Sequence, residues 1–125
     1  MELTFFESEL KVMRVLWREG ACNASHIADV LRKTVGWNIN TTYTVIKKCI
    51  AKGAIERTEP KFFCRPLVSE KEAQKAHTDE LVNDLYGGSV DKLFAALIER
   101  KKLPEDKLNE LRKIIGDLDE PSENS

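Results

Sequence analysis

Side chains that can bind a phosphate-bearing ligand gather in the stretch from residue 38 to residue 53. Two adjacent lysines there can neutralise phosphates, and short hydroxyl and amide groups toward its N-terminal end can hydrogen-bond to the edges of bases. No carboxylate occurs between residues 38 and 51, so no side chain of this stretch repels an anion. These properties suit duplex DNA, and the candidate DNA-binding residues are Asn40, Thr41, Tyr43, Thr44, Lys47 and Lys48.

The same stretch has the spacing of an amphipathic helix. Side chains suited to a core recur every three to four residues, on the side opposite most of the candidates: Thr42, Val45, Ile46, Cys49 and Ile50. We expect Asn40 to cap the first turn, because a short side-chain oxygen there can accept from a free backbone amide. We expect Gly53 to end the helix in a left-handed turn.

Two further helices are expected before this cationic helix. Thr4 and Glu7 have the spacing of a capping box, which opens a first helix that runs to Gly20. Asn23 or Ser25 can cap a second helix, whose last turn is basic. This second helix and the cationic helix that follows it are consecutive and short, and together they form a helix-turn-helix arrangement.

The hydrophobic period changes after the cationic helix. Residues 54–58 and 62–67 alternate between apolar and polar as strands do, and residues 59–61 contain a proline that favours a turn. A two-stranded hairpin at this position is a wing, which can lie along the phosphate backbone of DNA. The candidate phosphate contacts in or near its tip are Arg57, Lys61 and Arg65.

Three amphipathic helices are expected in the remainder of the chain. Ser69 and Glu72 form a second capping box, which opens the first of them. Gly87-Gly88 is expected to end this helix, and Ser89 can cap the next one. Pro104 fits the first turn of the last helix.

The predicted fold is mainly α with a small β-hairpin: a winged helix-turn-helix domain over residues 1–70, a helical dimerisation domain over 71–119, and a flexible tail over 120–125. Three short helices have too little volume for a core of their own, so we expect them to pack against a second copy in a homodimer. The residues expected in this interface are Leu81, Leu85, Leu93, Phe94, Leu97, Ile98, Leu108, Leu111 and Ile115.

Positive charge is concentrated in one segment of the chain, although the net charge of the whole chain is close to zero. The 125 residues have a formal net charge of −1, yet residues 32–65 contain eight basic and only two acidic side chains. Local positive charge is what a nucleic-acid surface needs. The composition, 42% apolar and 33% charged, is that of a globular chain with room for one domain or one small domain with an extension.

Several other classes of site lack the residues they need. The three cysteines, Cys22, Cys49 and Cys64, have no C-x-x-C pairing, so neither a disulfide framework nor a zinc cluster is expected. His26 and His77 have no partners at metal-ligand spacing, and no cofactor is expected. The sequence shows no nucleophile–base pair, no secretory leader and no membrane-length apolar run, which predicts a cytoplasmic protein that is not an enzyme.

Four segments together resemble the repressors that control penicillinase and methicillin-resistance genes in bacteria. They are LTFFESELKVMRVLW, the stretch around Trp37, Thr41, Thr44 and Ile46 through KGAI, then RPLVS, and LYGGSVDKL. The resemblance covers nearly the whole chain. It implies a winged-helix dimer that silences an operator until a membrane-bound sensor metalloprotease responds to a β-lactam and the repressor is cut in its C-terminal domain.

The chain departs from this family pattern at three places. Lys48 stands where the family usually has Arg, and Cys49 where it usually has Leu. The resemblance also implies that the cleaved bond, Asn-Phe in the family, corresponds to Ala96-Leu97 here. Copper-responsive relatives end in a cysteine-rich box, and the absence of cysteine from this tail argues against copper sensing.

Alternative hypotheses remain open at this stage. The winged helix can serve as a protein-interaction module without DNA, and a repressor of this fold can be released by a dissociable effector instead of a protease. Cys64 in the expected wing is a candidate thiol sensor, though a structural thiol is the simpler interpretation. Tyr43 and Trp37 are aromatic residues that can stack on bases, whereas Trp37 more often anchors a core in such a position.

Overall fold

The computed structural model describes residues 3–99, 105–107, 109–110 and 113, and its chain divides into two compact units, Met1–Glu80 and Leu81–Ser125. The helices are α1 (Glu7–Glu19), α2 (Ala24–Val35), α3 (Ile39–Ala51), α4 (Glu70–Tyr86) and α5 (Val90–Glu99), and the strands are β1 (Cys22–Asn23), β2 (Ile55–Thr58) and β3 (Phe63–Pro66). The predicted mainly helical fold with a hairpin wing is confirmed. None of the described helices is both long enough and apolar enough to cross a bilayer.

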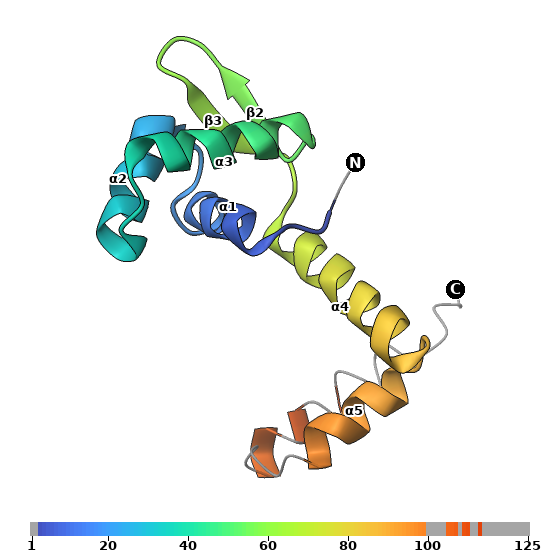
Figure 1. The fold of residues 1–125 in the computed structure, drawn as a ribbon. Coiled ribbons are helices and arrows are strands. Elements are labelled where there is room, and N and C mark those ends of the chain that lie inside the picture. Colours follow the sequence, from blue (N-terminus) through green and yellow to red (C-terminus); the bar gives the residue numbers. More distant parts are fainter. Residues whose placement is uncertain (1–2, 100–104, 108, 111–112, 114–125) are drawn as a thin grey trace. The chain divides into compact units, whose positions relative to one another are not determined.

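The first unit is a helix-turn-helix with a wing. Helix α3 packs against both α1 and α2, and the β2–β3 hairpin follows it directly (Figure 1). Strand β3 lies between β1 and β2 in an antiparallel sheet, with Cys22 opposite Cys64 and Arg57 also opposite Cys64 on the other side. The two-residue strand β1 was not predicted from the sequence, because so short a segment has no readable alternation.

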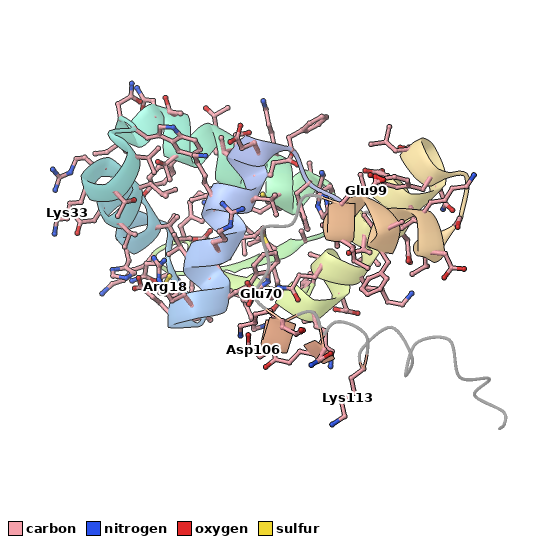
Figure 2. All side chains as sticks on the ribbon, turned by 90° about the horizontal axis from the view of Figure 1, so that it is seen from below. Arg18, Lys33, Glu70, Glu99, Asp106 and Lys113 are labelled. Carbon is pink, nitrogen blue, oxygen red and sulfur yellow. The ribbon has the colours of Figure 1, made fainter. Side chains whose placement is uncertain are left out.

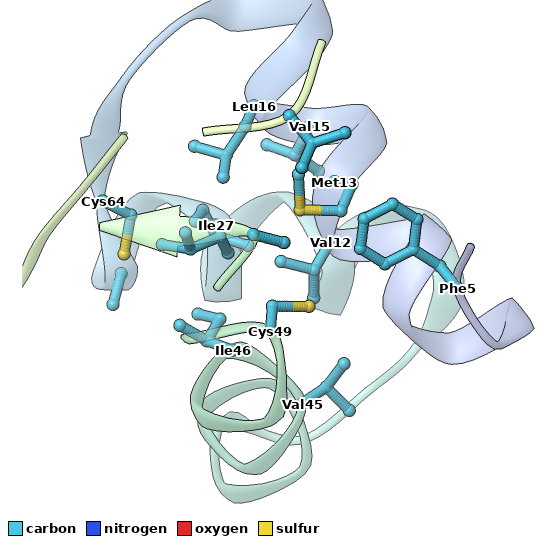
Figure 3. Packing of buried hydrophobic residues seen from close by; sticks show 14 of the residues in the cluster. Phe5, Val12, Met13, Val15, Leu16, Ile27, Val45, Ile46, Cys49 and Cys64 are labelled. Atoms are coloured by element: carbon cyan, nitrogen blue, oxygen red, sulfur yellow. The ribbon is translucent and has the colours of Figure 1, made fainter. Parts of the chain in front are cut away.

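One face of each helix contributes to a single core in this unit (Figure 3). Burial of a large apolar side chain contributes about 1.5–3 kcal/mol, so these faces fix how the three helices pack. The fully or nearly fully buried side chains are Val12, Met13, Val15 and Leu16 of α1, Ile27 and Leu31 of α2, and Val45, Ile46 and Cys49 of α3. Since α3 buries this face, its opposite face points to solvent.

The start of α1 differs from the prediction. The capping box is not Thr4 with Glu7: the helix begins at Glu7, and the carboxylate of Glu9 accepts from the Phe6 amide at 2.9 Å. The reason is a tertiary contact, because the Lys52 ammonium at the end of α3 donates to the Glu9 carboxylate at 2.7 Å and to the Thr4 carbonyl at 3.0 Å. This contact holds Glu9 inward, where it is 3% exposed.

The cap of α3 also differs from the prediction. Asn38, not Asn40, precedes the helix, and its side-chain oxygen accepts from the Thr41 amide at 2.8 Å. Asn40 therefore lies inside the first turn with its side chain exposed. The predicted end is correct, since Gly53 has a left-handed φ of 84°.

The predicted side-chain caps are formed at the starts of α4 and α5 but not at the start of α2. Asn23 is the residue before α2, but its side chain makes no capping bond, and the Ala24 amide donates instead to the Phe62 carbonyl at 2.9 Å. Ser69 and Glu72 form the predicted reciprocal capping box of α4, with bonds of 2.9 and 3.0 Å. The Ser89 hydroxyl accepts from the Lys92 amide at 3.2 Å at the start of α5.

The second unit exposes several residues that were predicted to lie in a dimer interface. Leu81 is 41% exposed, Leu85 70% and Leu97 38%, while Leu93, Phe94 and Ile98 are half-buried, and α5 contains no buried residue. The remaining predicted interface residues, Leu108, Leu111 and Ile115, lie outside the described residues, as do Pro104 and the predicted tail.

Candidate nucleic-acid interface

The outer face of α3 carries most of the candidate residues. Asn40, Thr41, Thr44, Lys47 and Lys48 are all exposed, and they recur at the spacing of neighbours on a helix surface. Neither Lys47 nor Lys48 forms an ion pair within the described part of the chain, so both ammonium groups are available to a ligand. The face therefore combines two unpaired positive charges with hydrogen-bonding groups toward the N-terminal end of the helix, as predicted.

Tyr43 is the candidate that the structure places differently. Its side chain is half-buried, and its ring meets the Phe62 ring edge-on, with centroids 5.5 Å apart. The ring thus joins α3 to the wing. Trp37 is also half-buried and packs on the core, as its position before the helix suggested.

Phe62 is a site-forming residue that sequence reasoning missed. It lies in the turn of the hairpin with a left-handed φ of 50°, and the Arg57 guanidinium carbon lies 3.6 Å from its ring centroid. Phe62 is thereby packed between Tyr43 of α3 and Arg57 of β2. The available signal was a run of two aromatic residues at the end of an expected turn, which does not reveal its long-range partner.

Two of the three wing residues predicted to contact phosphates, Arg57 and Arg65, form ion pairs with carboxylates of the wing itself. Arg57 donates to Glu59 at 2.6 Å, and Arg65 donates to Glu56 through two nitrogens at 2.6 and 2.9 Å. All four side chains are at least 41% exposed, and exposed ion pairs are worth only about 0–1 kcal/mol, so a phosphate can compete for either arginine. Lys61 at the tip is exposed and unpaired within the described residues.

The carboxylate of α2 nearest to this surface is also neutralised. Asp29 accepts from Arg32 at 2.9 Å and lies 3.0 Å from the Lys33 ammonium. Hydrogen bonds from Lys33 and Arg32 lower the pKa of the Asp29 carboxyl. The Lys33 side chain extends outward from α2 into solvent (Figure 2). Because both cations lie on the same helix as Asp29, a phosphate approaching α2 meets a cluster with a net positive charge.

The cysteines have the properties of structural thiols. Burial raises the pKa of Cys49 to about 12 and that of Cys64 to about 11, and it also raises the pKa of Cys22. The thiolate is the reactive form, and these thiols remain protonated at neutral pH. The geometry therefore gives no support to Cys64 as a thiol sensor.

Both histidines form hydrogen bonds within the first unit. His26 bonds to Glu19, and His77 accepts from the Phe5 amide at 3.1 Å. No group of three metal-ligating side chains occurs among the residues that the structure describes.

A recognition helix with an exposed cationic face, followed by a wing, defines a winged-helix DNA-binding protein. The family described as penicillinase repressor matches residues 6–117. The chain belongs to that family.

Individual relatives agree with this membership. The penicillinase repressor of Bacillus licheniformis is 26% identical over 111 residues, which is 87% of this chain and 87% of the relative. The methicillin resistance regulatory protein MecI of Staphylococcus aureus (strain N315) is also 26% identical over 111 residues, covering 87% of this chain and 90% of the relative. The solution structure of the DNA binding domain of the repressor BlaI superposes with a TM-score of 0.51 at 28% identity, over 54% of this chain and 85% of that domain.

Proposed function

We propose that this chain is a transcriptional repressor that binds a palindromic DNA operator as a homodimer. The observation that carries the proposal is the outer face of α3, where Lys47 and Lys48 are exposed and unpaired within the described residues, beside exposed Thr44. Membership of the penicillinase repressor family and the likeness to the DNA binding domain of BlaI support it. The same comparisons favour β-lactam-resistance or related genes as targets.

The residues of α3 have distinct roles in this proposal. Lys47 and Lys48 bind phosphates, which supplies affinity that depends on salt but not on sequence. Asn40, Thr41 and Thr44 lie closer to the N-terminal end of the helix and reach base edges in the major groove. Arg57, Lys61 and Arg65 place the wing along the backbone.

A homodimer accounts for the exposed apolar residues of the second unit. Leu85 is 70% exposed on α4, and Leu97 is 38% exposed on α5, so a single copy leaves both in contact with water. A second copy related by two-fold symmetry can cover them. It also brings a second recognition helix to the other half of a palindrome, and the tether can strengthen binding by about 10²–10⁴-fold.

Release by proteolysis follows from the same arrangement. The Ala96-Leu97 bond lies within α5, so a cut there removes part of the dimerisation element and leaves the first unit whole. A regular helix does not fit an extended protease cleft, so the segment must open locally before cleavage. A membrane sensor metalloprotease, or a protease that acts after it, is the partner proposed for this step.

Two alternatives are separated from this proposal by experiment. A protein-interaction module of the same fold would not bind duplex DNA in a salt-dependent way. A repressor released by a dissociable effector would bind DNA but would remain uncut on induction. Both keep the fold and change only what the surfaces contact.

Two measurements at several salt concentrations test the DNA-binding step. The full chain is titrated against duplexes from the DNA upstream of its own gene, and its binding site on that DNA is mapped by footprinting. Lys47→Ala should weaken binding to all duplexes alike and reduce the salt slope by about 0.9, the value of one phosphate contact. Thr44→Ala should instead change the preference between sequences by about tenfold. Equal losses for both variants that do not depend on salt would contradict the assignment of these two roles.

A further inference from the structure

Ile39 is an apolar residue at the N-terminal end of the recognition helix α3, and its side chain is not part of the hydrophobic core. It is the first residue of α3 and is 58% exposed, whereas Val45, Ile46 and Cys49 of the same helix are buried. It stands directly before Asn40, one of the residues proposed to reach base edges. An exposed isoleucine at this position contributes little to stability, so it is free to serve recognition.

A small hollow opens beside this side chain, between α2 and α3. Ala28, Ile39 and Tyr43 give it apolar walls, and its volume is about 150 Å³. Its remaining lining consists of Ser25, Asp29 and Arg32 of α2.

The walls of the hollow are held in place before any ligand binds. Tyr43 is fixed edge-on against Phe62 of the wing, and Asp29 is held by Arg32 at 2.9 Å. The carboxylate that faces the hollow is therefore neutralised by a cation on the same helix. The hollow can accept an apolar group carried by a polyanion without a net repulsive charge.

We propose that Ile39 and this hollow recognise the 5-methyl group of a thymine in the major groove. This inference rests on the proposed DNA binding and adds a specificity determinant to it. The thymine methyl is the one apolar group that base pairs present in the major groove, and an alkyl side chain contacts it without a hydrogen bond. An isoleucine cannot pair with any polar base edge, so apolar contact is the recognition chemistry available to it.

Uracil-substituted DNA isolates this contact, because deoxyuridine differs from thymidine only by the missing methyl. The full chain is first used to select a tightly bound duplex from a random library, and each thymine in the footprint is then replaced singly by uracil. Loss of one buried methyl should weaken binding about fourfold at one thymine in each half-site. Ile39→Ala should also weaken binding, and it should abolish the difference between thymine and uracil at that position.

Val35→Ala is the matched control, because Val35 is a 40% exposed apolar residue of α2 that does not line the hollow. This variant should keep both the affinity and the fourfold uracil effect. Ile39→Val keeps a branched side chain and should retain part of the effect, which guards against a general defect of the alanine variant. If uracil has no effect at any position, or if the uracil and Ile39→Ala losses simply add, the inference is overturned while DNA binding stands. Failure to bind any duplex would overturn the proposed function and this inference together.

Discussion

At the scale of single residues, the charged side chains of the surface differ in what they must give up to bind a phosphate. Lys47 and Lys48 have no ion-pair partner within the described residues, whereas Arg57 and Arg65 must each leave a carboxylate of the wing. In the proposed complex with DNA, Glu56 and Glu59 compete with the phosphate backbone for these two arginines. We therefore expect the wing to contribute less to affinity than its three positive charges alone suggest.

Glu59→Gln should increase affinity for duplex DNA by up to about fivefold at low salt, because it releases Arg57 and removes a repelling charge. The amide oxygen can still accept from the Phe62 amide, which Glu59 contacts at 3.4 Å, so the turn should keep its shape. Binding titrations check this, and most of the gain should disappear when Arg57→Gln is added. The exposed Glu105→Gln makes the same charge change in the second unit, and an equal gain there would show that Arg57 is not involved.

The buried thiols make stability depend on pH in the alkaline range. Burial raises the folded-state pKa of Cys49 to about 12 and of Cys64 to about 11, above the value of about 8.5 for a thiol in an unfolded chain. The native state therefore retains protons that the unfolded state loses. Their contribution to stability is complete below about pH 8.5 and falls as the pH rises from there toward 11 and 12.

Urea denaturation at pH 8 and at pH 10.5 measures this dependence. Cys49→Ala should reduce the loss of stability between the two pH values, while Val45→Ala should lower stability at both and leave the difference unchanged. Val45 is the matched control because it is buried on the same face of α3 and does not titrate. An unchanged pH dependence in Cys49→Ala would show that the thiol does not contribute.

At the scale of elements, the features that could be predicted were those set by nearby residues. The order of helices, the Ser69–Glu72 capping box and the left-handed end of α3 at Gly53 all depend on spacing within a turn or two. One local feature was nevertheless predicted wrongly, because Asn38 and Asn40 are both able to cap α3 and spacing alone does not choose between them. The other features that could not be predicted depend on distant partners. Glu9 pairs with Lys52 across 43 positions, β1 exists only by pairing with β3, and Tyr43 meets Phe62 of the wing. A local pattern carries no information about such contacts.

The Glu9–Lys52 pair should be important for how α1 attaches to α3. Glu9 is 3% exposed, and the Lys52 side chain is 15% exposed. Removal of one partner from a buried ion pair leaves the other incompletely compensated, so Glu9→Ala should lower the free energy of unfolding by about 3 kcal/mol. Chemical denaturation measures the change. Glu7→Ala, which removes an 88% exposed carboxylate two residues earlier, should change stability by less than about 0.5 kcal/mol; similar losses for both variants would mean that the buried pair has no special role.

At the scale of the whole molecule, positive and negative charge are divided between the two halves of the sequence. Residues 1–70 carry 11 basic and 8 acidic side chains, whereas residues 71–125 carry 9 and 13. The first half is therefore suited to DNA, and the second would repel it. Leu81, Leu85 and Leu97 are exposed on α4 and α5, and a second copy of the chain is the partner proposed to cover them.

Truncation after Ala96 tests whether the dimer controls operator binding. The cut removes the last residues of α5, including Leu97 and Ile98, and everything that follows, but leaves the first unit intact. We expect the truncated protein to sediment as a monomer and to bind the operator at least about tenfold more weakly, because the second recognition helix is no longer tethered. Its first unit should keep the thermal unfolding and the spectra of the full chain. The full-length variant Glu99→Gln is the control, because it makes a polar change on the same helix, and it should dimerise as the wild type does.

A truncated protein that still dimerises and gives the footprint of the full chain would rule out release by cleavage at this bond. A dissociable effector would then be the better explanation.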